Sequence, residues 1–391
     1  MNAKKNLNQK RGVFFSFFII IFLAGGSALF AENWKLELFN KATKGYAPQW
    51  AKEQIEEDLA PFMSGISKQQ LDNTMASSAA NQALLVRYTI SNGKISVRPA
   101  PALPPEWIGF FEGRLKNLTH SLDQLNQCVN LPNVDFIVSL YDDCTTFRKE
   151  EFQAPVFSFA KDKMQDSRII LMPDFESLED HTYLFQEIRG GVLEYPWQMK
   201  TSKAFWRGTT TGVIKKINGT FDTRYTYLNY LEFPRVKLTQ LSLAFPDLID
   251  AKFNSLCQGA EQLVLQFNSF LGNFTPIREH LKYKYQILID GNSCAYTRAY
   301  WELFSETVMF KQTSDNVQWY YRALQPYVHY IPINNDVSDL LEKIKWAQMH
   351  DETAFKIAQN AKTFAEGNLQ TSDVYLYFYL ILQAYAKLLK E

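Results

Sequence analysis

The sequence of 391 residues is poor in the patterns that mark several protein classes. Its four cysteines have no CxxC spacing and no histidine-rich neighbourhood, which argues against a zinc site, and four are too few for a disulfide scaffold. The 17 glycines and 15 prolines are too few for a collagen-like or low-complexity chain. The 41 basic residues are balanced by 41 acidic residues, so the surplus typical of nucleic-acid binding is lacking and we expect no nucleic-acid partner.

Apolar residues, by contrast, are present in the amounts that a folded protein needs. Hydrophobic residues make up 46% of the chain and charged residues 21%, which excludes disorder as the main state. An aromatic content of 15% supplies material for a large core, or for two. The length predicts two or three domains.

The N-terminus has the pattern of an export signal. Four lysine and arginine residues lie between positions 4 and 11, and the apolar run VFFSFFIIIFL begins at Val13. A basic region, an apolar segment and then small residues such as Gly26 and Ala28 are typical of a signal peptide. The run is also close to the lower limit for a membrane span. We therefore expect residues 1–31 to be a signal peptide or a single membrane anchor acting through residues 13–30, with the remainder exported.

Short β-rich runs between helical patterns predict an α/β protein. VRYTI (86–90) and KISVRP (94–99) flank Asn92-Gly93, which is a hairpin signal. VDFIVSL (134–140) and RIILMP (168–173) are predicted to be buried strands with polar residues at their ends, where open α/β sheets bind ligands. The apolar stretch of the last predicted helix, VYLYFYLILQAYAKLL, is too short to span a bilayer, which predicts a core helix.

Two predicted strand–loop–helix junctions carry the chemical signal. KAFW leads into RGTTTG (207–212), with Lys215 expected one helical turn further on, and YQILI leads into DGNS (290–293), followed by Arg298. Helix N-termini and nearby cations attract anions, so two such junctions suit a diphosphate such as that of a nucleotide sugar. Each loop taken alone is more typical of an ordinary turn. Neither contains a Walker A or GxGxxG pattern, which argues against a dinucleotide-dependent oxidoreductase.

Four segments together resemble glycosyltransferase family 90: KAFWRGTTTG, TRYTYLNYL, KYKYQILIDGNSCAYTRAYWELF and QWYYRALQPYVHYIPINNDVSDLLEKIKWA. That family includes fungal capsule-associated, bacterial lipopolysaccharide-modifying and animal protein O-glucosyltransferases. The resemblance covers most of residues 134–365 and is most specific in 282–348. It implies a GT-B-like fold in which two Rossmann-like domains face a cleft and a C-terminal helix packs across them.

The resemblance also implies a domain plan and a reaction. An acceptor-side α/β domain is expected at 32–195, a nucleotide-sugar-binding α/β domain at 196–370, and a helix docking back on the first domain at 371–391. The implied reaction is an inverting, metal-independent transfer from a UDP-sugar donor, with no further cofactor and with a glycan or protein as the acceptor. An inverting transfer needs a base on the acceptor hydroxyl, opposite the leaving group.

Residue roles follow from the resemblance alone. The implied base is Asp142, which is followed here by Asp143-Cys144 where the animal enzymes have an aromatic residue and a proline. Lys215 stands where those enzymes have a phosphate-contacting arginine. The residues implied to bind the donor are Arg207, Gly208, Thr209, Lys215, Gly291, Ser293, Ala295, Tyr296 and Arg298.

Several alternatives stay open at this stage. The first choice of acceptor is a cell-surface glycan, and the alternatives are a protein serine, a catalytically inactive carbohydrate-binding protein, or an enzyme acting on phosphate esters. Asp142-Asp143 also fits an acidic metal-binding motif. His329, in an expected strand, is either a core histidine or a ligand. Asp174 lines the acceptor cleft or caps its strand, and Lys161 is expected to be solvated.

Overall fold

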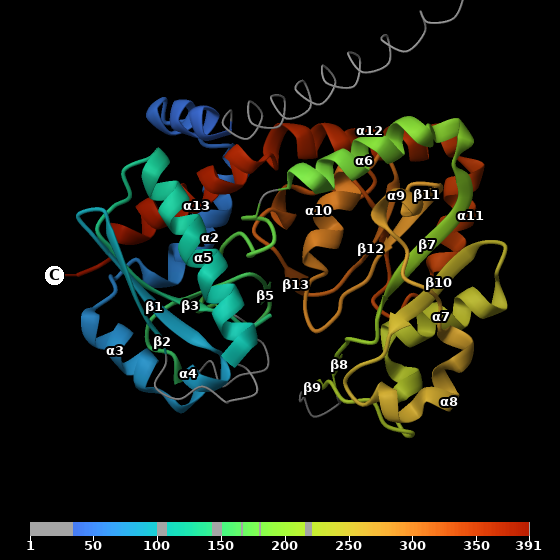
Figure 1. Ribbon diagram of the computed structural model, residues 1–391, viewed down its shortest axis with the longest axis horizontal. Helices are drawn as coiled ribbons and strands as arrows, with labels where there is room; N and C mark the ends of the chain where they lie inside the picture. Colours follow the sequence, from blue (N-terminus) through green and yellow to red (C-terminus); the bar gives the residue numbers. More distant parts are fainter. Residues whose placement is uncertain are drawn as a thin grey trace, which may run out of the picture.

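The computed structural model describes residues 34–99, 108–142, 151–165, 167–179, 181–215 and 221–390. These residues form two α/β lobes that lie side by side (Figure 1). The expected signal or anchor lies outside this range, as do Asp143 and Cys144. In the described part of the chain, no helix combines the length and the apolar character that crossing a membrane requires.

The first lobe contains a mixed five-stranded sheet in the order β2-β1-β3-β4-β6. β1 is antiparallel to β2 and β3, whereas β3, β4 and β6 run parallel. Asn92 and Gly93 both have positive φ and close the β1–β2 hairpin, so the hairpin prediction is confirmed. The strands are β1 (Leu85–Ser91), β2 (Lys94–Pro99), β3 (Val134–Ser139), β4 (Val156–Ser158) and β6 (Ile169–Leu171).

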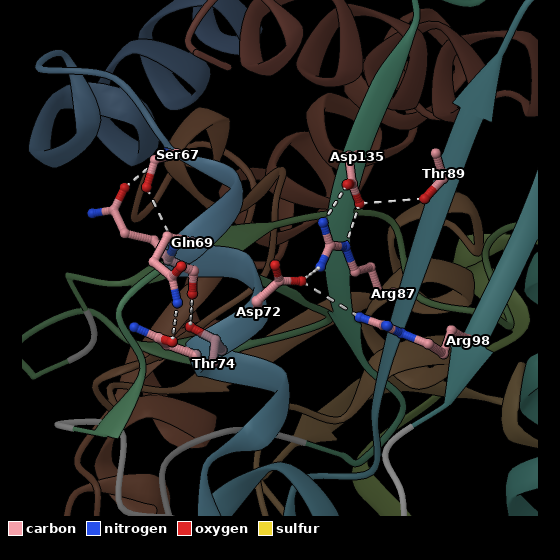
Figure 2. Close-up of polar contacts among 10 residues, drawn as sticks. Ser67, Gln69, Asp72, Thr74, Arg87, Thr89, Arg98 and Asp135 are labelled. Carbon is pink, nitrogen blue, oxygen red and sulfur yellow. Dashed lines mark hydrogen bonds and ion pairs between the residues drawn. The ribbon is translucent and has the colours of Figure 1, made fainter. Parts of the chain in front are cut away.

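Ion pairs and caps fix the helices of this lobe to its sheet. Figure 2 shows Arg87 of β1 between Asp135 of β3, with an Nε–Oδ1 distance of 2.6 Å, and Asp72 of α3. Ser67 caps α3 by exchanging hydrogen bonds with Gln70. The helices are residues 34–43, α2 (Gln49–Leu59), α3 (Lys68–Ala76), α4 (Ser78–Gln82) and α5 (Ile108–Cys128).

The second lobe contains an all-parallel five-stranded sheet in the order β10-β7-β11-β12-β14. Numbered along the chain this is the order 2-1-3-4-5, a doubly wound sheet whose order reverses between β7 and β11. Ligands of such sheets bind beyond the carboxyl ends of the strands at this reversal. The strands are β7 (Thr201–Thr209), β10 (Ile249–Ser255), β11 (Tyr283–Leu288), β12 (Val308–Gln312) and β14 (Ile331–Ile333).

Helices cover this second sheet, and two short ladders accompany it. β8 pairs with β9, and β5 of the first lobe pairs with β13 of the second, so a ladder joins the two lobes. The helices are α7 (Pro234–Ala244), α8 (Val264–Phe267), α9 (Ile277–His280), α10 (Tyr296–Phe304) and α11 (Leu340–Met349), and the short strands are β5 (Lys161–Asp162), β8 (Ile214–Lys215), β9 (Phe221–Asp222) and β13 (Asn316–Val317).

The chain crosses between the lobes twice. α6 (Thr182–Glu194) packs against α9 and α10 of the second lobe, although the expected domain boundary falls after it, at 195/196. α12 (Asp351–Asn368) packs on α10 and α11, and α13 (Thr371–Ala386) then packs against α2 and β3 of the first lobe (Figure 1). The mixed α/β class is confirmed. The GT-B arrangement stays a prediction, because the first sheet is only partly parallel.

Candidate functional site

A cavity of about 270 Å³ lies where β7 and α10 come together, at the reversal point of the second sheet. Glu176 comes from the loop after β6 in the first lobe, and the other lining residues come from the second lobe. The cavity is lined by Glu176, Trp206, Gly208, Thr209, Thr211, Arg235, Ala295, Tyr296, Thr297 and Arg298.

Two glycines allow the loops around this cavity to approach closely. A Cβ atom on Gly208 would lie 2.5 Å from the indole ring of Trp206. A Cβ atom on Gly291, in the loop after β11, would lie 2.9 Å from Thr211 Oγ1 and 3.0 Å from Arg235 Nη2. Neither position has room for a side chain without a shift of its neighbours. The loop after β11 therefore approaches Thr211 and Arg235 closely, whereas the close contact of Gly208 lies within β7.

Arg235, near the start of α7, holds these loops together. Its guanidinium donates to the carbonyl oxygens of Thr209, Asp290 and Ile289 at 3.0, 2.9 and 3.2 Å, and to Thr211 Oγ1 at 2.7 Å. None of these four partners is a carboxylate. Burial lowers the pKa of Arg235 to about 10, and the group is still a cation at neutral pH. A buried cation at the wall of a cavity favours an anionic ligand.

Arg298 contributes a second cation from the first turn of α10. Its Nη2 donates to the Arg207 carbonyl, and its Nη1 lies 3.5 Å from Glu302 Oε1 without forming a hydrogen bond to it. Burial raises the pKa of the fully buried Glu302 to about 8, against the opposing effect of Arg298. Glu302 therefore remains largely protonated near neutral pH, which leaves the Arg298 charge available to a ligand.

The loop before α10 also contacts the first lobe at Asp142. Ser293 Oγ donates to the Asp142 carbonyl at 3.3 Å, and the Tyr296 hydroxyl donates to the same oxygen. The two hydroxyls lie 2.7 Å apart. The backbone of Asp142 is thus bound directly to residues beside the cavity, across the junction of the lobes.

The side chain of Asp142 is held by Arg114 of α5. Arg114 Nη2 donates to Asp142 Oδ1 at 2.7 Å, while its Nη1 donates to the Leu140 carbonyl at 2.7 Å. The guanidinium also stacks on the ring of Phe175, 4.2 Å from its centre. The Asp142 side chain is 30% exposed, so a carboxylate oriented by Arg114 is accessible at the end of β3.

Glu176 lies within a turn that is held by Asp174, and its carboxylate accepts a hydrogen bond from the Thr297 backbone N–H of α10. Asp174 is fully buried and accepts hydrogen bonds from the backbone N–H groups of Glu176 and Ser177, at 3.1 and 3.0 Å, and from Ser177 Oγ at 2.6 Å. Asp174 therefore has the capping role. Burial, and then the Asp174 charge, raise the pKa of Glu176 to about 7, while the Thr297 backbone N–H opposes that rise.

The structure brings together some of the residues expected to bind the donor and places others elsewhere. Gly208, Thr209, Ala295, Tyr296 and Arg298 line the cavity, whereas Gly291 and Ser293 lie in the adjoining loop. The Arg207 guanidinium does not line it, because it pairs with Asp250 at 2.8 Å and stacks on Phe205.

Lys215 differs from expectation in its local structure. It was expected one turn into a helix that follows RGTTTG, but it lies in β8, which pairs with β9. In the described part of the chain, the first α-helix after this loop is α7, which begins at Pro234. The strand–loop–helix pattern therefore holds for the segment from β11 to α10 but not for the segment after β7.

The remaining candidates are structural. Lys161 is buried against Asp58, so the expectation that it is solvated is wrong. His329 lies in the turn before β14 rather than in a strand, and its Nδ1 accepts a hydrogen bond from the Gln325 backbone at 3.0 Å. Among the described residues, no group of three or more His, Cys, Asp and Glu side chains is placed to hold a metal ion.

Sequence reasoning missed Arg235, Arg114 and Glu176. Arg235 stands in FPRVK and Arg114 in a long amphipathic helix, where an arginine is ordinary. Glu176 lies two residues after Asp174, the polar strand end that was singled out. Its position after a strand was the one local signal available.

Comparison with known proteins gives one family and several relatives. The model of glycosyl transferase family 90 matches residues 44–217 and 230–391. Protein O-glucosyltransferase 2 of Danio rerio is 30% identical over 345 residues, 86% of this chain and 62% of that protein. Protein O-glucosyltransferase 3 of Homo sapiens is 30% identical over 344 residues, 85% of this chain and 61% of that protein. The chain thus spans about three fifths of the length of these two relatives.

A third relative and one solved structure complete the comparison. Protein O-glucosyltransferase 1 of Homo sapiens is 23% identical over 380 residues, 92% of this chain and 87% of that protein. A glycosyltransferase structure from Rickettsia africae ESF-5 matches with a TM-score of 0.33 at 9% identity, covering 61% of this chain and 64% of that chain. That likeness is too weak to identify the fold.

Proposed function

The chain belongs to glycosyltransferase family 90, and on that premise we propose that it transfers a sugar from a UDP-sugar to a hydroxyl group of a protein, with inversion and without a metal ion. The observation that carries the proposal is the cavity at the reversal point of the second sheet. Two arginines and the first turn of a helix meet there, which is the setting that a diphosphate requires.

The proposed reaction is a single displacement. The Asp142 carboxylate takes the proton of the acceptor hydroxyl, the acceptor oxygen bonds to the anomeric carbon, and the bond from that carbon to the diphosphate oxygen breaks. UDP leaves with the negative charge. Arg235 and Arg298 stabilise the charge as it develops. Arg114 orients the base.

The choice of acceptor rests on the relatives. The sequence alone ranks a glycan first, whereas the relatives are named for O-glucosyl transfer to proteins. Those names support a glucosyl donor and a protein hydroxyl as acceptor. The test described below also includes glycan acceptors, so that transfer to a glycan would be detected. We also propose export of the catalytic part, on the basic and apolar pattern of residues 1–31.

The test is UDP release from a panel of UDP-sugars, with and without acceptor peptides containing serine and with oligosaccharides. We expect release that depends on a peptide acceptor and continues in EDTA. Asp142→Asn should lose at least about 10²-fold in rate while its affinity for UDP is unchanged, because the base contacts the acceptor. Calorimetric titration with UDP provides the control for folding.

Three outcomes would contradict the proposal. Failure of the wild-type protein to bind UDP or to release it from any donor would leave a carbohydrate-binding role. Strong inhibition by EDTA that manganese reverses would overturn the metal-free mechanism. An Asp142→Asn variant that keeps most of its rate would place the base at another residue.

A further inference from the structure

Glu176 is the feature of the cavity that the proposed reaction does not yet use. It is the carboxylate among lining residues that are otherwise cationic, hydroxylated or apolar. It also comes from the first lobe, whereas the residues proposed to hold the diphosphate come from the second. The Glu176 carboxylate accepts a hydrogen bond from the Thr297 backbone N–H in the first turn of α10, so a UDP-sugar bound with its phosphates at Arg235 and Arg298 has Glu176 beside that turn.

The position of Glu176 is fixed by its neighbours. The preceding turn is held by the three hydrogen bonds to the buried Asp174 carboxylate. Phe175 is packed between the Arg114 guanidinium at 4.2 Å and the Phe159 ring at 5.4 Å. A carboxylate on so well supported a turn is a precise hydrogen-bond acceptor.

The charges in the cavity decide which part of the ligand meets Glu176. A carboxylate repels phosphate oxygens, so the diphosphate is favoured at the arginines and disfavoured beside Glu176. A carboxylate accepts hydrogen bonds through two oxygens, which suits the hydroxyl groups of a sugar. From this geometry we infer that Glu176 binds hydroxyl groups of the donor's sugar and thereby selects which UDP-sugar is used.

This inference rests on the proposed function and adds a determinant of donor choice to it. A site built to bind a hydroxyl group discriminates strongly against a sugar that lacks it or presents it at another angle, because the buried acceptor is then left without a partner. The carboxylate does not need to take the proton of the acceptor in this role. That task stays with Asp142.

The test compares Glu176→Ala and Glu176→Gln with the wild-type protein on UDP-glucose, UDP-galactose, UDP-xylose and UDP-N-acetylglucosamine. For Glu176→Ala we expect kcat/KM on the preferred donor to fall about 10- to 100-fold, the size of a lost hydrogen bond to a charged group. Glu176→Gln should fall in between. The ratio of kcat/KM between the preferred donor and its C4 epimer should fall at least about tenfold. Affinity for UDP itself should stay within about threefold.

The matched control is Glu179→Gln. Glu179 lies three residues away in the same loop, is exposed, and accepts a hydrogen bond from Asn117 at 2.7 Å, so the same charge is removed away from the cavity. This variant should keep the wild-type donor preference. Melting temperatures of all three variants separate loss of folding from loss of recognition.

Each other outcome speaks against the inference. If both Glu176 variants kept the wild-type ratios of kcat/KM between donors, the carboxylate would not take part in recognition of the sugar. Equal loss of rate on every donor, with unchanged KM values, would make Glu176 a base instead. A tenfold or greater gain in UDP affinity on Glu176→Gln would place the carboxylate at the phosphates. If the wild-type protein uses no UDP-sugar, the proposed function fails, which is a different result.

Discussion

Replacement of Arg235 separates its two suggested tasks, which are joining the loops and attracting the diphosphate. Arg235→Met keeps most of the apolar volume of the side chain but removes the charge and all four hydrogen bonds to Thr209, Thr211, Ile289 and Asp290. Arg235→Lys keeps the charge but cannot reproduce the planar fork that reaches both loops. The two variants should therefore differ in how they bind UDP.

The expected size follows from the contacts. A charge-assisted hydrogen bond contributes about 1.5–3 kcal/mol, so loss of the phosphate contact in Arg235→Met should weaken UDP binding by about 2–3 kcal/mol, roughly 30- to 150-fold in Kd. Three carbonyl oxygens that Arg235 satisfies would also lose a donor, which destabilises the fold by about 3 kcal/mol in all. Arg235→Lys should lose roughly tenfold in UDP affinity, because the point charge remains.

Calorimetric titration with UDP gives the affinities, and thermal unfolding with and without UDP gives the stability. Uridine serves as the control ligand, because it lacks phosphate, and its affinity should respond much less to either substitution. The reasoning would be refuted if Arg235→Met bound UDP as tightly as the wild-type protein. Equal losses for UDP and uridine would show that Arg235 acts only by shaping the loops.

Two further predictions concern burial and close packing. The pKa of Glu302 is raised to about 8 in the folded state and is lower in the unfolded state, so the folded state binds more protons between these two values. The free energy of unfolding should therefore fall as pH rises towards 8, by at most about 1.4 kcal/mol per pH unit. Glu302→Gln should flatten this slope in denaturant unfolding from pH 5 to 8, and an unchanged slope would exclude Glu302 as its source. Gly291→Ala should weaken UDP binding and destabilise the fold by about 1–3 kcal/mol, because its Cβ would meet Arg235 and Thr211. Gly113→Ala in α5, which has open space around it, should instead stabilise the fold by about 0.5–1 kcal/mol. Similar changes in the free energy of unfolding for the two variants would contradict the close approach of the loops.

The sequence predicted well what is encoded locally. The segment from Tyr283 to Phe304 folds as a strand, a loop and a helix, because its apolar run, its glycine and its helical pattern lie within some twenty residues. The Asn92-Gly93 hairpin is a similar case. The α/β class followed from several such segments. The mixed character of the first sheet did not, since strand direction depends on connections that periodicity does not describe.

The failures concern contacts between distant segments. Among the described residues after β7, a short β-ladder stands where a helix was expected, and α7 begins only at Pro234. Arg235 of α7 donates hydrogen bonds to Thr209 and Thr211 of this loop, and spacing along the sequence cannot identify that contact. Arg207, by contrast, was chosen from its motif, but Asp250 of the adjacent strand binds its guanidinium.

The contacts of Asp142 join the proposed base on one lobe to the proposed donor site on the other. Its carbonyl binds the hydroxyls of Ser293 and Tyr296, while its carboxylate binds Arg114. The same loop that lines the cavity therefore fixes the backbone of the proposed base, and a shift of that loop moves both. Effective catalysis requires the reacting groups to be held to within a fraction of an ångström, which flexible lobes could not provide unaided. Loss of the Tyr296 hydroxyl in Tyr296→Phe should therefore lower kcat more than it raises KM for the donor, and the reverse pattern would assign Tyr296 to donor binding alone.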